Sequence, residues 1–276
     1  DFAFFKDIDT ANTNWWTGAR LMQGKNLILN VSNAEGNAAS SMLFDHQAGW
    51  YVDSDAGSDH QAFMWKRHAG FDVVTYKGDG LTAGKQLCHS LSKTPEMIWV
   101  KDRDSAAGDW AVYHKGMNSG TNPQNYYMYL NSTGAEATGT SFWKDTAPTS
   151  THFTVGYAEA TNKARNYIAM LFASVDGISK VGSYTGTGNT PLSVTCGFQP
   201  RFIILRDSSN GGPWRVLDTL RDTLGSGNDK SLSLNSNAAQ VDNTDWVDIN
   251  STGFNVISQD PEVNVSGRNY VWYAHA

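Results

Sequence analysis

The chain has 276 residues with 26 Gly, 7 Pro and 2 Cys, and its aromatic residues are 10 Trp, 11 Tyr and 12 Phe. This aromatic content excludes intrinsic disorder, because it provides enough apolar surface to offset the entropy lost on folding. The formal charge of −6 is spread along the chain, which excludes a nucleic-acid surface built from clustered Lys and Arg. No apolar run approaches the ~18 residues of a membrane span, so we expect no membrane insertion.

Short runs of β-branched and aromatic residues, separated by clusters of Gly, Asn, Ser and Asp, predict strands along the whole chain. In chain order, such runs occur at residues 50–52, 97–101, 126–130, 202–206, 253–258 and 270–275. Helical periodicity is scarce by comparison. We therefore predict an all-β fold whose polar faces present hydroxyl and amide groups.

The sequence repeats itself with a period of about 100–108 residues. Residues 29–35 match residues 130–136 and 234–240, and residues 61–65 are a degenerate copy of residues 165–169 and 268–272. Further matches are the strand-ending pairs and the Trp residues that follow them: Lys6 and Asp7, Lys101 and Asp102, Arg206 and Asp207, then Trp15, Trp110 and Trp214. These matches predict a tandem array of three homologous small β-sandwich-like domains at 1–69, 70–174 and 175–276.

The first of these predicted domains is truncated at its N-terminus. The second and third each begin with a strand that ends in Tyr-x-Gly-x-Gly, at residues 76–80 and 184–188, whereas the first has no such strand. Its sheet should therefore have a vacant strand position, and an unpaired edge favours aggregation. Either preceding sequence fills this position, or a neighbouring chain donates a strand.

Acidic pairs are the candidate metal ligands. Asp7 with Asp9 and Asp102 with Asp104 occupy matching positions, and Asp-x-Asp begins calcium loops when further oxygen ligands follow. Neither pair has a closing Glu at the needed spacing. The alternative is a turn in which Asp accepts hydrogen bonds from backbone amides, and calcium is the one cofactor that we consider.

The recurrent tryptophans have two interpretations. They either fill the core with each indole N–H bonded locally, or form a platform on which sugar rings stack, placed in loops on a rigid β scaffold. The candidate carbohydrate-binding residues are Trp15, Trp16, Trp110 and Trp214.

Nucleophilic and acid–base chemistry is not indicated. The two cysteines, Cys88 and Cys196, follow the motif Tyr by the same distance, so we expect two separate buried thiols and not a disulfide. Glu35 and Glu136 occupy matching positions where the third copy has Gln240, and no Gly-x-Ser-x-Gly motif or phosphate-binding loop occurs. We predict no catalytic residues and a non-enzymatic protein.

Several of these residues together resemble a known kind of repeat. The Tyr-x-Gly-x-Gly strand, residues 197–207, Trp214, residues 234–235 and residues 269–274 are similar to repeat domains of unknown function in virion structural and tail-fibre proteins of marine bacteriophages. The resemblance covers the second and third copies well and the first partly, and residues 90–95 depart from it. It implies a location and a structural role, and it has no catalytic residues to transfer.

The expected function is that of a bacteriophage tail fibre or surface appendage at the virion surface that takes part in host attachment. Its expected partners are other virion proteins or copies of itself in a homo-oligomer, together with a host-surface glycan, because tandem copies raise avidity. Two alternatives stay open: a secreted, extracellular bacterial lectin or adhesin, and a tailspike that depolymerises polysaccharide.

Overall fold

The computed structural model describes residues 1–276 except 23, 39–41, 47–48, 52–58, 69 and 223. Its regular structure is nearly all antiparallel β sheet, which confirms the predicted all-β fold. The described residues include one short α-helix, α1 (Thr140–Trp143), and the 3-10 helices η1 (Arg20–Met22), η2 (Met117–Gly120) and η3 (Pro123–Asn125).

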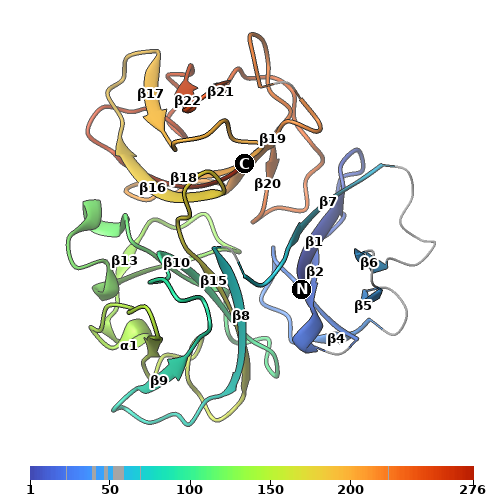
Figure 1. Ribbon diagram of the computed structural model, residues 1–276, viewed down its shortest axis with the longest axis vertical. Helices are drawn as coiled ribbons and strands as arrows, with labels where there is room; N and C mark the ends of the chain where they lie inside the picture. The colour runs from blue at the N-terminus through green and yellow to red at the C-terminus, as the bar shows by residue number, and fades with distance from the viewer. Residues whose placement is uncertain (23, 39–41, 47–48, 52–58, 69, 223) are drawn as a thin grey trace.

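Three large sheets follow one another along the chain (Figure 1). The first sheet has the order β4 (Gly36–Asn37), β3 (Lys25–Ile28), β2 (Trp16–Ala19), β1 (Phe2–Asp7) and β7 (His60–Trp65). The second has the order β13 (Ala137–Thr138), β12 (Tyr126–Tyr129), β11 (Ala111–His114), β10 (Met97–Asp102), β15 (Asn166–Phe172) and β8 (Phe71–Lys77). The third has the order β16 (Ser179–Thr185), β23 (Asn269–His275), β18 (Phe202–Asp207), β19 (Arg215–Asp218) and β20 (Leu232–Ser233).

Smaller sheets form an outer layer, so the molecule is sandwich-like at its periphery (Figure 1). The outer strands are β5 (Leu43–His46) with β6 (Gly49–Tyr51), β9 (Lys85–Cys88) with β14 (His152–Val155), and β17 (Leu192–Thr195) with β22 (Gly253–Val256) and β21 (Val247–Asn250). In Figure 1 each outer group lies on the side of its large sheet that faces away from the centre.

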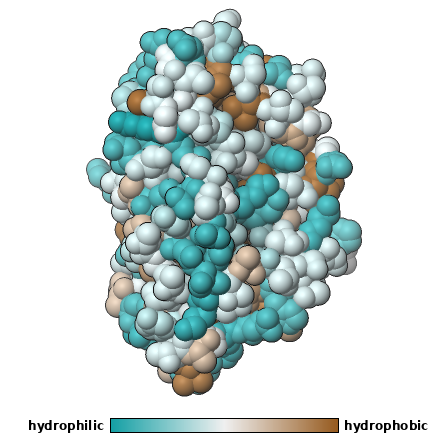
Figure 2. All heavy atoms as spheres, turned by 90° about the vertical axis from the view of Figure 1, so that its left-hand side faces the viewer, coloured by the Kyte–Doolittle hydropathy of each residue, from teal (hydrophilic) through white to brown (hydrophobic). Residues whose placement is uncertain are grey.

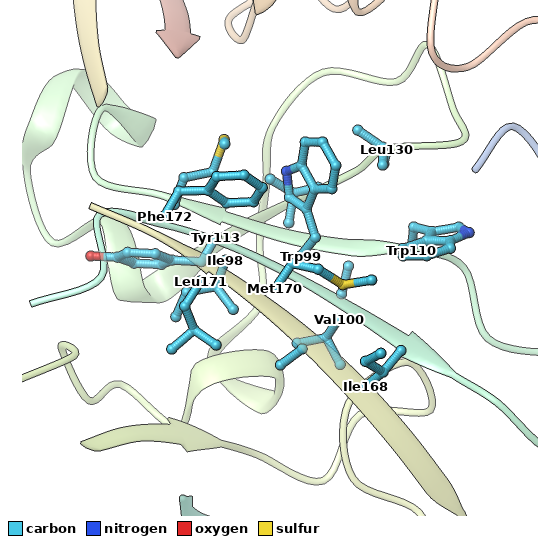
Figure 3. Packing of buried hydrophobic residues seen from close by; sticks show 14 of the residues in the cluster. Ile98, Trp99, Val100, Trp110, Tyr113, Leu130, Ile168, Met170, Leu171 and Phe172 are labelled. Carbon is cyan, nitrogen blue, oxygen red and sulfur yellow. The ribbon is translucent and has the colours of Figure 1, made fainter. Parts of the chain in front are cut away.

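The side chains of the large sheets alternate between an inner and an outer face, as the two-residue period of a strand requires. In the second sheet Trp99 pairs with Met170, and Ile98 pairs with Leu171. Figure 3 shows Trp99 and Phe172 on one side of these strands and Leu171 on the other. Both faces are buried, because the inner face meets the other sheets and the outer face meets the small sheet.

An aromatic core joins all three large sheets. Phe4 of the first sheet lies 6.4 Å from Trp99 of the second and 6.5 Å from Phe202 of the third, measured between ring centroids. Phe172 lies 5.1 Å from Tyr273, which closes the triangle. One hydrophobic cluster therefore contains residues of every large sheet. The predicted tandem arrangement of three separate domains is not confirmed, because these sheets share a core.

One side of the surface, over the left of Figure 1, is mostly hydrophilic or neutral, and its hydrophobic residues form small separate patches (Figure 2). Such a surface is typical of a face exposed to water, whereas a broad apolar patch would indicate an interface.

Candidate functional site

Most of the tryptophans predicted to bind carbohydrate are buried. Trp15 and Trp110 have no exposed surface and Trp214 is 1% exposed, whereas Trp16 at the start of β2 is 36% exposed. A sugar ring can stack only on an exposed ring face. The three recurrent residues are therefore buried as the core interpretation predicts, but their indole N–H groups bond to other sheets and not locally. Trp16 alone among the four candidates presents a surface to solvent.

The buried indoles connect neighbouring sheets. Trp15 Nε1 donates to Ser233 O at 2.8 Å, and Trp110 Nε1 donates to Ile28 O at 2.9 Å. Trp214 Nε1 donates to Tyr129 O at 3.0 Å. The first sheet thus bonds to the third, the third to the second, and the second to the first. These hydrogen bonds form a closed ring around the molecule.

The repeated Leu-Asn pairs hold these tryptophans. Asn30, Asn131 and Asn235 each accept a hydrogen bond on Oδ1 from the backbone N–H of the Trp in their own sheet, at 2.9, 2.9 and 2.8 Å. The Leu residue that precedes each of these Asn residues donates its backbone N–H group to the backbone carbonyl of the same Trp. The residue before each Leu provides the carbonyl that accepts an indole from the neighbouring sheet.

Three buried cations lie near the same junctions. Lys6, Lys101 and Arg206 are fully buried, and all of them hydrogen-bond backbone carbonyl groups. Lys6 Nζ reaches Asn237 O at 3.2 Å, and Arg206 Nη1 reaches Ser132 O at 2.8 Å, so both bonds cross between sheets. Burial lowers the pKa of each Lys to about 8 and that of Arg206 to about 9.

The acidic candidates cap turns. Asp7 Oδ1 accepts the backbone N–H groups of Asp9 and Thr10 at 3.0 and 2.9 Å. Burial works to raise the pKa of Asp7, but these backbone hydrogen bonds outweigh it and the pKa is lowered.

The second acidic pair has the same geometry. Asp102 Oδ1 accepts the N–H groups of Asp104 and Ser105 at 2.9 and 3.2 Å, and Asp102 Oδ2 pairs with Arg165 at 2.6 Å. Asp104 accepts the backbone N–H of Asn166 at 2.8 Å. Among the described residues no three His, Cys, Asp or Glu side chains are grouped as metal ligands. The backbone N–H bonds that Asp7 and Asp102 accept are those that the turn interpretation predicts.

One thiol lies in a pair that the sequence did not reveal. Cys88, the last residue of β9, is exposed, contrary to the expected burial, whereas Cys196, directly after β17, is buried in a hydrophobic cluster. Cys88 Sγ lies 3.2 Å from His152 Nε2, directly across the β9–β14 ladder, and His152 Nδ1 lies 2.7 Å from Thr151 Oγ1. Sequence spacing could not reveal the pair, because β9 and β14 are separated along the chain by strands β10 to β13, although they are neighbours in space.

Among the described strands, β7 is the last strand of the first sheet. β7 pairs with β1 on one side and ends its sheet on the other, whereas β15 and β23 are each covered by a further strand, β8 and β16. A groove of about 280 Å³ runs beside this edge. It is lined by residues 61–65 of β7, by Phe202 and His275 of the third sheet, and by Leu220, which follows β19.

The strand register corrects one expected match. His60 pairs with Asp7, as Tyr167 pairs with Asp102 and Tyr270 with Asp207. The expected match of residues 61–65 with residues 165–169 is therefore displaced by three residues. The correct register places His60 where the other sheets have a tyrosine.

The class that the fold defines is an all-β protein made of several antiparallel sheets. Residues 53–276 match the family described as Domain of unknown function (DUF7483), and the chain belongs to this family. Neither the curated proteins nor the solved structures include a significant match to the chain. In the part of the chain that the structure describes, no helix combines the length and apolarity needed to cross a membrane.

Proposed function

We propose that the chain is a non-enzymatic structural protein of a bacteriophage virion, a tail fibre or surface appendage that assembles with other virion proteins. In this proposal residues 1–69, 70–174 and 175–276 are three related units. The virion location is supported by the resemblance to marine bacteriophage repeat domains described above.

The structural role is supported by the contacts that the repeated residues make. The recurrent Trp and Asn residues join the large sheets through buried hydrogen bonds. Residues that served a shared catalytic or binding site would instead be expected to line a cleft with unpaired polar groups. The same contact between sheets recurs in all three units, and this recurrence favours the interpretation that the chain is a rigid scaffold.

Particle labelling tests this function. Antibodies raised against the purified chain should bind appendages of intact virions in immunogold electron microscopy, and the chain should appear in mass spectra of purified particles. A chain found free in the medium and absent from particles would overturn the virion role. Release of reducing ends from host polysaccharide would overturn the non-enzymatic role.

Host attachment is tested separately through Trp16, which presents an exposed ring. If the appendage binds a host glycan there, Trp16→Ala should weaken binding on a glycan array by about tenfold. Tyr157, which is 40% exposed, provides the matched control. Equal binding by the Trp16→Ala and Tyr157→Ala proteins would exclude Trp16 from attachment.

A further inference from the structure

We propose that Cys88, with His152 as its base and Thr151 to orient that base, is a nucleophilic thiol that takes up small disulfides by thiol–disulfide exchange. The ligand class is a low-molecular-weight aliphatic disulfide, and the product is a mixed disulfide on Cys88. The inference goes beyond the proposed structural role and does not rest on it, because a scaffold protein in any location can carry such a modification site.

The thiol faces a base directly across the β9–β14 ladder. Cys88 pairs with His152 in this ladder, and Cys88 Sγ lies 3.2 Å from His152 Nε2. A thiol and a base at hydrogen-bond distance form an activated nucleophile, because the base can take the proton and leave the reactive thiolate. Cys88 is exposed, so a small disulfide can reach its sulfur from solvent.

Two threonine hydroxyl groups orient the imidazole. Thr151 Oγ1 lies 2.7 Å from His152 Nδ1 and 3.4 Å from Thr149 Oγ1, and Thr149 Oγ1 donates to the backbone carbonyl of His152 at 3.2 Å. When each hydroxyl donates to the next oxygen, His152 Nδ1 carries the proton and donates to Thr151. His152 Nε2 then has the lone pair that accepts the thiol proton, so a third group orients the base as in other activated nucleophiles.

The other titratable side chains beside this pair bond to backbone carbonyl groups. Lys85 Nζ donates to the last carbonyl of β8 at 2.7 Å, and His89 Nε2 lies 3.1 Å from Thr149 O. Among the described residues, His152 is the titratable side chain that hydrogen-bonds Cys88. The base is therefore the histidine across the ladder and not the one next to Cys88 in the sequence.

The third unit provides an internal comparison. Thr195 pairs with Gly253 in the β17–β22 ladder at the position where Cys88 pairs with His152 in the β9–β14 ladder, and in both ladders the next pair is apolar and buried. A Cβ on Gly253 would lie 2.0 Å from Val194 O, so a histidine does not fit there. The outer ladder thus forms without a thiol and a base, and the pair is an addition to the second unit that the fold does not require.

The exchange needs no further oxidant. His152 Nε2 takes the proton from Cys88 Sγ, and the thiolate attacks one sulfur of the incoming disulfide. The bond between the two sulfurs of that disulfide breaks as the bond to Cys88 forms. The leaving thiolate then takes the proton from His152, so the sulfur of Cys88 is oxidised and the leaving sulfur is reduced.

Reaction of the whole 276-residue chain with hydroxyethyl disulfide tests the site. Mass spectrometry of the intact protein should show a single adduct, and peptide mapping should place it on Cys88. Dithiothreitol should remove the adduct, because a mixed disulfide is reversed by an excess of thiol. An adduct on Cys196 alone, or the absence of any adduct, would overturn the proposal.

His152→Ala separates activation by a base from simple exposure. At about pH 7 this variant should react about tenfold more slowly than the unsubstituted chain, because the thiol proton must then pass to water. At about pH 9.5 a thiol ionises without a neighbouring base, so the two rates should agree within about twofold. Equal rates near pH 7, or the same difference at both pH values, would contradict the role of His152 as a base.

A matched thiol in the third unit provides the control. Cys88→Ser combined with Thr195→Cys moves an exposed thiol to the same position of the β17–β22 ladder, where Gly253 provides no base. Near pH 7 this double variant should react at about the rate of His152→Ala, and circular dichroism should show that both variants are folded. A rate equal to that of the unsubstituted chain would mean that exposure alone explains the reaction, and the proposal would be rejected.

A chelator distinguishes thiol exchange from metal binding. A Cys and a His can together bind a soft metal ion, so each rate is measured with and without EDTA. A thiol that reacts only after EDTA treatment would be a metal ligand, and this result would also reject the proposal. Particle labelling is independent of these measurements. Failure of the exchange would leave the virion role standing, and failure of the labelling would leave the thiol site standing.

Discussion

Replacing Asn131 by Ala should destabilise the fold, because its side chain makes two hydrogen bonds, one of them to a buried backbone N–H group. Asn131 Oδ1 accepts the backbone N–H of Trp110 at 2.9 Å, and Trp110 has no exposed surface. Its loss leaves a buried donor without a partner, which costs about 1–3 kcal/mol. Asn131 Nδ2 also donates to Asp109 Oδ1 at 2.7 Å, and that bond is lost too. For a chain of this size the melting temperature should fall by about 2–10 °C.

Urea unfolding followed by tryptophan fluorescence measures the change in the free energy of unfolding. The matching substitutions Asn30→Ala and Asn235→Ala should fall in the same range, because each residue holds its own Trp in the same way. Thr133→Ala, at an exposed position in the same loop, should change stability by less than about 0.5 kcal/mol. If Asn131→Ala lowered the free energy of unfolding by no more than Thr133→Ala does, the reasoning would be refuted.

Three further predictions concern pH, thiol chemistry and close packing. Burial raises the pKa of Asp229 to about 7, so the contribution of its protonated form to folding stability is fully present below about pH 4 and is lost as the pH rises through 7. Asp229→Asn should therefore raise the melting temperature most at pH 8, and a difference from the unsubstituted protein that does not change with pH would count against this prediction. Ellman's reagent should modify exposed Cys88 in the folded protein well before buried Cys196, whose pKa burial raises to about 11; equal rates would contradict this. Gly78→Ala should destabilise by more than about 2 kcal/mol in urea unfolding, because its Cβ would lie 2.0 Å from Lys163 O, and a neutral effect would show that the backbone moves freely.

The repeated pattern in the sequence identified residues that recur in each unit, but the contacts that these residues make emerged only from the structure. Leu130, Asn131 and Trp110 are close enough along the chain that their recurrence could be recognised in the sequence. The indole of Trp110 bonds to Ile28 O, which belongs to a different sheet. No local pattern specifies such a partner, so a sugar platform and a buried connector had the same appearance in the sequence.

The acidic pairs and the cysteines show the same limit. Asp102 and Asp104 have the spacing of a calcium loop, but their oxygens accept backbone N–H groups and a hydrogen bond from Arg165. Cys88 and Cys196 hold matching sequence positions, yet one is exposed and the other is buried. Burial depends on which residues pack over a strand end, and those residues come from elsewhere in the chain.

The sequence by itself determined the all-β class, because alternation and turn residues act over a few positions. Which strands pair within each sheet emerged only from the structure, since central pairs such as β1 with β7 join segments far apart in the chain. Only the tertiary structure decided how the sheets meet. Rings such as Phe4, Trp99 and Phe202 gather into one core from all three sheets. The hydrophobic effect that buries these rings is non-directional, and the partners of each ring come from segments far apart in the chain. A repeat along the chain therefore predicts similar units and leaves open whether they stand apart or pack around a common centre.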